Sequence, residues 1–120
     1  MNARLAQVCH FKHDGTALRR FCDLVSGEVE TDDGDLLSYR MGGASVAHHP
    51  PMGDLEEDDV LVTLEVASAV GVDRIHAKLE RAGLVVDDQP EDTEWGYRVF
   101  YFRAAPHLIF EIVAPLPHSG

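Results

Sequence analysis

The sequence predicts an α+β fold of two tandem βαβββ modules that form a curved, open-barrel sheet with the helices on its convex side. Two observations lead to this prediction. The order strand, helix and three strands occurs twice, and the second copy begins about 55 residues after the first. A single helix also leaves one sheet face of such a module uncovered, so two modules side by side enclose a shared concave cleft. We therefore expect one domain over residues 1–120, with module one at about 1–52 and module two at about 60–116.

The first module starts with an apolar strand predicted over residues 5–11. The residues Asp14-Gly15-Thr16 then provide a helix start, and apolar side chains recur at spacings of three and four between Leu18 and Val25. After this helix, turn residues separate three short strands, predicted at 28–31, 36–41 and 44–48.

The second module repeats this order. A strongly apolar strand is predicted over 60–66, and an apolar helical stripe comes next over 72–82, with Gly83 as the terminating glycine. The remaining strands are predicted at 84–87, 98–103 and 108–113. Five of the six residues 54–59 are Asp or Glu, so we expect residues 53–59 to be a solvated acidic connector between the modules.

Charge and composition exclude several classes of function. Ten Lys and Arg against 21 Asp and Glu give a formal net charge of −11, which repels nucleic-acid backbones and anionic lipid surfaces. No apolar run reaches the length that spans a bilayer, and the N-terminus has no apolar signal-peptide core, so we expect a cytoplasmic protein. In that compartment Cys9 and Cys22 are expected to be reduced core residues.

Three stretches carry a resemblance to a known superfamily. They are VDRIHAKLERAG at 72–83, DTEWGYRVFYFR at 92–103 and HLIFEIV at 107–113; FCDLVSG at 21–27 matches more weakly. The chain resembles the vicinal oxygen chelate superfamily, which includes glyoxalase I, extradiol dioxygenases and bleomycin-resistance proteins. This resemblance implies a glyoxalase-like fold. One departure is the turn ending at His107, where the superfamily usually has glycine.

The resemblance also implies where a divalent metal would bind, because family enzymes place one inward ligand on each of strands 1, 4, 5 and 8. By position, strand 1 supplies Gln7 and strand 8 supplies Glu111, while strand 4 supplies Val46 with His48 two residues on. Strand 5 supplies Leu61, which cannot bind a metal. The implied cofactor is therefore either none or a single divalent metal held by Gln7, His48 and Glu111.

Glu111 is the candidate catalytic residue, and Gln7, His48, Trp95 and Glu111 are the candidate ligand-binding residues. A carboxylate in the apolar run 108–113 must bind a metal, pair with a cation, accept hydrogen bonds, contact water or be protonated. Trp95, the only tryptophan, lies in a loop where it either caps the cleft over a ligand or plugs the edge of the barrel.

Three functions remain open from the sequence. The first is a protein that binds a small organic ligand, of the glyoxalase/bleomycin-resistance type, without an intact family metal site. The second is a metal-dependent lyase, isomerase or dioxygenase in which Glu111 is ligand or base, so whether the protein is an enzyme stays open. The third is a non-catalytic dimeric structural or regulatory domain. In each case we expect a homodimer and no nucleic-acid or membrane partner.

Overall fold

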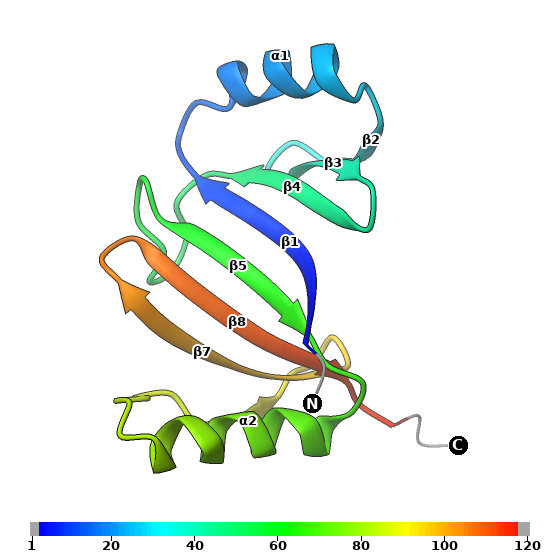
Figure 1. Ribbon diagram of the computed structural model, residues 1–120. Helices are drawn as coiled ribbons and strands as arrows, with labels where there is room; N and C mark the ends of the chain where they lie inside the picture. Colours follow the sequence, from blue (N-terminus) through cyan, green and yellow to red (C-terminus); the bar gives the residue numbers. More distant parts are fainter. Residues whose placement is uncertain (1–2, 118–120) are drawn as a thin grey trace.

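The computed structural model describes residues 3–117 (Figure 1). Each half of this region runs strand, helix and three strands. The elements of the first half are β1 (Arg4–Phe11), α1 (Thr16–Val25), β2 (Val29–Asp32), β3 (Leu37–Met41) and β4 (Ala44–His49). Those of the second half are β5 (Val60–Glu65), α2 (Ala69–Arg81), β6 (Glu91–Asp92), β7 (Tyr97–Ala105) and β8 (Leu108–Pro115). Neither helix in this region is long and apolar enough to cross a membrane.

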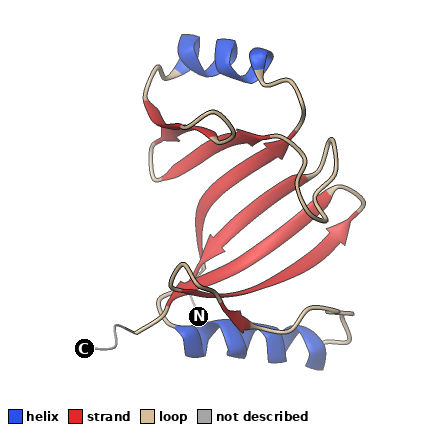
Figure 2. Ribbon diagram, turned by 180° about the vertical axis from the view of Figure 1, so that it is seen from behind, coloured by secondary structure: helices blue, strands red, loops and turns tan. Residues whose placement is uncertain are grey.

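Within the described residues the strands form one mixed sheet in the order β2-β3-β4-β1-β5-β8-β7-β6 (Figure 2). The two halves have the same local pairing, since β1 runs parallel to β4 and β5 runs parallel to β8. An antiparallel ladder between β1 and β5 joins the halves at the centre of the sheet. The sheet does not close into a barrel. This arrangement confirms the predicted α+β fold of two βαβββ modules with an open, curved sheet.

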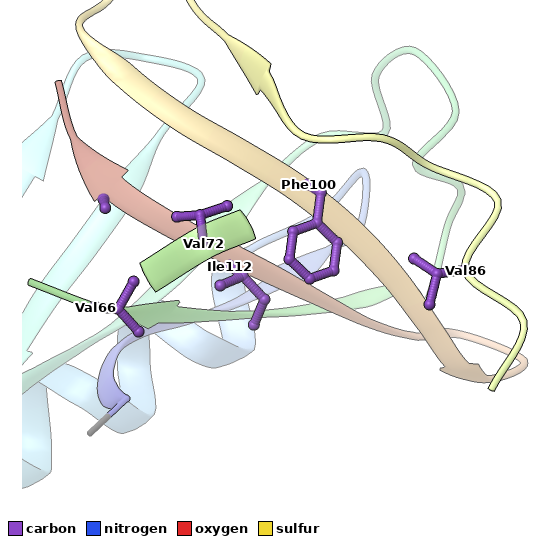
Figure 3. Packing of buried hydrophobic residues seen from close by; sticks show 6 residues of the cluster. Val66, Val72, Val86, Phe100 and Ile112 are labelled. Carbon is purple, nitrogen blue, oxygen red and sulfur yellow. The ribbon is translucent and has the colours of Figure 1, made fainter. Parts of the chain in front are cut away.

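Helix α2 covers one face of the second half of the sheet. The buried cluster beneath it comprises Val66, Val72, Val86, Phe100, Ile112 and Ala114 (Figure 3). Ser68 caps the start of the helix, because its side chain accepts a hydrogen bond from the Gly71 N–H. In the first half, α1 packs Cys22 against Leu37 and Tyr39 on the same side of the sheet. The opposite face therefore carries no helix.

Helix α1 uses only part of its apolar surface within the described chain. Cys22 is its only buried residue, whereas Phe21, Leu24 and Val25 are 59%, 80% and 62% exposed. The hydroxyl of Tyr39 donates a hydrogen bond to Asp23 Oδ1 at 2.6 Å and helps to hold the helix on the sheet. A row of large apolar side chains on the outer side of α1 thus remains available for contact.

The strand predicted at residues 84–87 is wrong, because the strand before β7 is the short β6 and residues 84–87 pair with no other strand. The alternation that predicted it is real: Val85 is exposed, and Val86 is buried in the cluster beneath α2. The segment is held instead by Asp88, whose carboxylate accepts a hydrogen bond from the Tyr101 N–H at 2.8 Å. The Asp88 side chain thus accepts the hydrogen bond that the Tyr101 N–H would otherwise donate to a neighbouring strand.

The turn between β7 and β8 places His107 where the superfamily usually has glycine. His107 adopts a left-handed backbone conformation with φ 66°, which is uncommon for residues other than glycine. Its ring Nδ1 lies 2.9 Å from Oδ1 of Asp59, and its carbonyl accepts a hydrogen bond from the Val60 N–H. The buried Asp59 thereby fixes the end of the acidic connector to this turn.

Candidate functional site

A row of polar side chains crosses the face of the sheet that carries no helix. Ladder partners point to the same side, and the registers align Ser45, Gln7, Thr63, Glu111 and Tyr101 across β4, β1, β5, β8 and β7. The residues under α2, such as Phe100 and Ile112, alternate with them and face the other way. The structure therefore brings Gln7 and Glu111 to one face, with Thr63 between them.

Glu111 accepts a hydrogen bond from a neutral donor. The Thr63 hydroxyl donates to Glu111 Oε1 at 3.0 Å, and Tyr101 is the ladder partner of Glu111 on β7. No Lys or Arg forms an ion pair with Glu111 among residues 3–117. Of the environments expected for this carboxylate, the structure thus contains a donor side chain on an open sheet face.

The carboxylate of Glu111 changes the acidity of two neighbours. Burial raises the pKa of Tyr101, and the neighbouring Glu111 raises it further, so the phenol stays neutral and keeps its proton. Burial, with a smaller contribution from Glu111, raises the pKa of Cys9 to about 12. Cys9 at neutral pH is therefore a thiol and not a nucleophilic thiolate.

A cavity of about 700 Å³ lies beside this row. Tyr101 from β7 and Ile109 from β8 contribute to its lining on the sheet. One further part of the lining is the start of the acidic connector, and another is the segment before β6. The lining residues are Met52, Gly53, Asp54, Leu55, Val85, Asp87, Asp88, Tyr101, Phe102, Arg103 and Ile109. Tyr101 connects the two parts of the site, because it lines the cavity and is also the ladder partner of Glu111.

The side chains at the implied metal positions do not fit a metal site of the family type. Gln7 and Glu111 share a face, but Leu61 lies between Cys9 and Ile109 on that face and has no donor atom. Strand β4 presents Ser45 and Ala47 there, since it is these residues that pair with Gln7 and Cys9. No three His, Cys, Asp or Glu side chains in the described part of the chain come together in a way that could hold a metal ion.

His48 is not brought together with Gln7 and Glu111. Its side chain points to the same side of β4 as that of Val46, which packs in the cluster under α1, and it is buried there. Its Nε2 lies 2.6 Å from the carbonyl oxygen of Lys12. A Cβ atom at Gly15 would lie only 2.7 Å from its ring, so the loop before α1 packs directly on the imidazole. These contacts describe a packed structural histidine.

Trp95 lies at the end of the site region and not over the cavity. It belongs to the turn between β6 and β7, is 60% exposed, and packs its ring against Tyr97 at a centroid distance of 5.9 Å. Tyr97 and Tyr101 are four residues apart on β7, which is about 13 Å along a strand. Trp95 is absent from the lining of the 700 Å³ cavity, as are Gln7, His48 and Glu111.

Most of the residues that form the cavity were not predicted from the sequence. The connector reads as solvated because it is acidic, yet its apolar residue Leu55 packs against the cluster around Phe11 and holds the connector over the sheet. An isolated antiparallel bridge between Met52 and Leu55 shapes this part of the connector. The signal available in the sequence was the single leucine within the acidic run, together with the aromatic alternation that includes Tyr101.

No protein-family model and no curated protein sequence matches this chain. A solved structure from Legionella pneumophila, described as an NAD-dependent benzaldehyde dehydrogenase, aligns with a TM-score of 0.68 at 12% identity over 91% of this chain and 97% of that one. A glyoxalase/bleomycin resistance protein/dioxygenase superfamily member from Vibrio splendidus gives 0.61 at 13% identity, over 95% and 99%. A variant of the Streptomyces coelicolor methylmalonyl-CoA epimerase, in complex with 2-nitronate-propionyl-CoA, gives 0.61 at 15% identity over 96% and 99%. Identities this low establish a shared fold, and one fold hosts many activities.

Proposed function

Because the chain has the glyoxalase-like fold of the vicinal oxygen chelate superfamily, we propose that it is a small-molecule-binding protein of the glyoxalase/bleomycin-resistance type without the family metal site. One observation carries this proposal. A cavity of about 700 Å³, within the size range of ligand pockets, lies on the open sheet face, and its residue Tyr101 is the ladder partner of Glu111. An apolar floor beside a few polar groups is the usual composition of such sites.

In this proposal Glu111, which lies beside Tyr101 and outside the cavity lining, is a hydrogen-bond acceptor for a ligand that extends past Tyr101. Gln7 lies farther along the same face. Thr63 donates to the Glu111 carboxylate, which helps to hold it in one orientation and leaves further lone pairs free to accept. Trp95 contacts only those ligands that extend along β7 beyond the cavity. His48 has a structural role in the first module.

The experiment is a thermal-shift screen of small organic molecules with wild-type protein, followed by titration of each hit. A ligand at one hundred times its Kd stabilises the folded state by about 2.7 kcal/mol, which is readily measured. Glu111→Gln should weaken the affinity of a hit by about tenfold, because an amide replaces a charged acceptor of the same shape. The control is Glu91→Gln, which removes a carboxylate from the exposed strand β6. If no compound binds, or if both variants bind equally well, the proposal is wrong.

A metal-dependent lyase, isomerase or dioxygenase is the second candidate. Its support is the position of Glu111 and Gln7 on one face, and the lack of a donor at Leu61 counts against it. Elemental analysis of protein purified without chelator decides between the two. A stoichiometric divalent metal that is lost in Glu111→Ala would favour the enzyme over the metal-free binder.

We also propose a homodimer, and the observation that favours it is the exposed apolar surface of α1. Phe21, Leu24 and Val25 present large side chains to solvent, and patches of this kind often mark contacts between proteins. A dimer that binds no small molecule would correspond to the third candidate, a structural or regulatory domain. The ligand screen and sedimentation together separate it from the first.

A further inference from the structure

We infer that the ligand of the 700 Å³ cavity is an organic cation with an apolar body, an inference that rests on the proposed function. The cavity combines an apolar lining with an excess of carboxylates over cationic side chains. A molecule that carries a positive charge on a large nonpolar surface matches both properties at once.

The apolar lining surrounds the space on more than one side. Leu55 from the connector and Ile109 from β8 are partly or fully buried beside it. Met52 and Val85 also line it, yet they are 53% and 78% exposed, which is costly for large apolar side chains. They come from two separate segments, so a ligand between them would remove apolar surface from water on both sides.

The charges of the cavity are unbalanced. Its lining includes the carboxylates of Asp54, Asp87 and Asp88, against a single guanidinium from Arg103. Within residues 3–117, neither Asp54 nor Asp87 forms an ion pair or a side-chain hydrogen bond, whereas Asp88 accepts the Tyr101 N–H. The charge of Arg103 also acts on Asp59, whose pKa it helps to lower, and is thereby shared with a carboxylate outside the cavity.

The whole chain adds to this negative potential. Its formal net charge is −11, and a cleft lined by one sign of charge concentrates the field within it. An anionic ligand such as a carboxylate or phosphate ester would have to approach against that field. A cation would be attracted both at long range and inside the cavity.

The arrangement favours a bulky cation over a metal ion. The three carboxylates do not come together with any other donor as a group that could hold a metal in the described structure. They are instead distributed around an apolar space of about 700 Å³. This geometry suits a positive charge carried on or delocalised over an apolar or aromatic body.

The experiment compares three fluorescent probes that differ in charge. They are the cationic dye thioflavin T, the neutral N-phenyl-1-naphthylamine and the anionic 8-anilino-1-naphthalenesulfonate. Each is titrated with wild-type protein, with the double variant Asp54→Asn/Asp87→Asn, and with the control Asp35→Asn/Glu91→Gln. The control changes the net charge by the same amount, but neither residue lines the cavity.

We expect the cation to bind wild type most tightly and the sulfonate most weakly. The cavity variant should lose about tenfold in affinity for the cation, at about threefold for each exposed carboxylate, and the neutral dye should be unaffected. The control should change the affinity for the cation by less than about twofold, and added salt should weaken cation binding to wild type.

The other possible results contradict either the inference about charge or the proposed binding function. If the neutral dye binds as tightly as the cation, or the two double variants behave alike, the inference about charge is wrong while the proposed binding function stands. If none of the three probes binds to saturation and the compound screen also fails, the binding function itself is refuted.

Discussion

Replacing Asp59 by asparagine removes the charge from the joint that fixes the acidic connector to the sheet. Asp59 is 1% exposed. Its Oδ2 accepts a hydrogen bond from the Glu56 N–H at 2.8 Å, and its Oδ1 accepts one from Nδ1 of His107 at 2.9 Å. Asparagine keeps the shape and one acceptor oxygen, but its amide nitrogen cannot accept from the His107 ring. The substitution therefore removes one hydrogen bond to a buried charge and weakens the other.

The expected cost can be worked out from these two contacts. A hydrogen bond to a charged group contributes about 1.5 to 3 kcal/mol, so Asp59→Asn should lower the free energy of unfolding by about 2 kcal/mol. In a chain of this size that loss corresponds to roughly 8 °C in melting temperature. Asp59→Ala should cost more, because it leaves the Glu56 N–H and the His107 ring without this partner.

The dependence on pH provides a second measurement. Burial raises the pKa of Asp59, but the hydrogen bonds from Glu56 and His107, with the charge of Arg103, outweigh burial and hold it below the ordinary value of 3.8. A lowered carboxyl pKa stabilises the fold above the unfolded pKa, and that stability is lost as the pH falls through the folded value. The difference between wild type and Asp59→Asn should therefore be full at pH 7 and shrink below about pH 4.

The assay is urea unfolding followed by circular dichroism at pH 7 and at several acid pH values. The matched control is Asp58→Asn. Asp58 is the neighbouring residue and has a positive φ, which asparagine tolerates, and its carboxylate pairs with Lys12 at the surface. We expect little change in that variant. A cost below about 0.5 kcal/mol for Asp59→Asn, or an equal cost in the two variants, would refute the reasoning.

Three further outcomes are expected. Leu61→His should strengthen Ni²⁺ binding in calorimetry by at least about tenfold, because an imidazole would then lie on the same face as Glu111; no gain would show that the two positions cannot share an ion. Cys9 and Cys22, whose burial raises the pKa of each thiol, should resist iodoacetamide at pH 8 in native protein and react in urea, as followed by mass spectrometry. Sedimentation at micromolar concentration should give twice the chain mass for wild type and the monomer mass for Leu24→Asp, whereas a wild-type monomer would contradict the dimer proposal.

Local patterns in the sequence were sufficient for most of the architecture. The spacing of apolar residues predicted both helices, and the repeated order of elements predicted the two modules, because each pattern reflects a period of the backbone itself. The same information failed at residues 84–87. There the alternation is present, but Asp88 takes the main-chain donor that a strand partner would need.

The site depended on contacts that no local pattern contains. Side chains alternate along a strand, so Ser45 and His48, three residues apart in β4, face opposite sides. Only the ladder with β1 decides which of them shares a face with Gln7. The sequence identified Glu111 as a charge that needs partners. Only the folded chain places Thr63 of β5 and Tyr101 of β7 beside it, because these strands meet through pairings between distant segments.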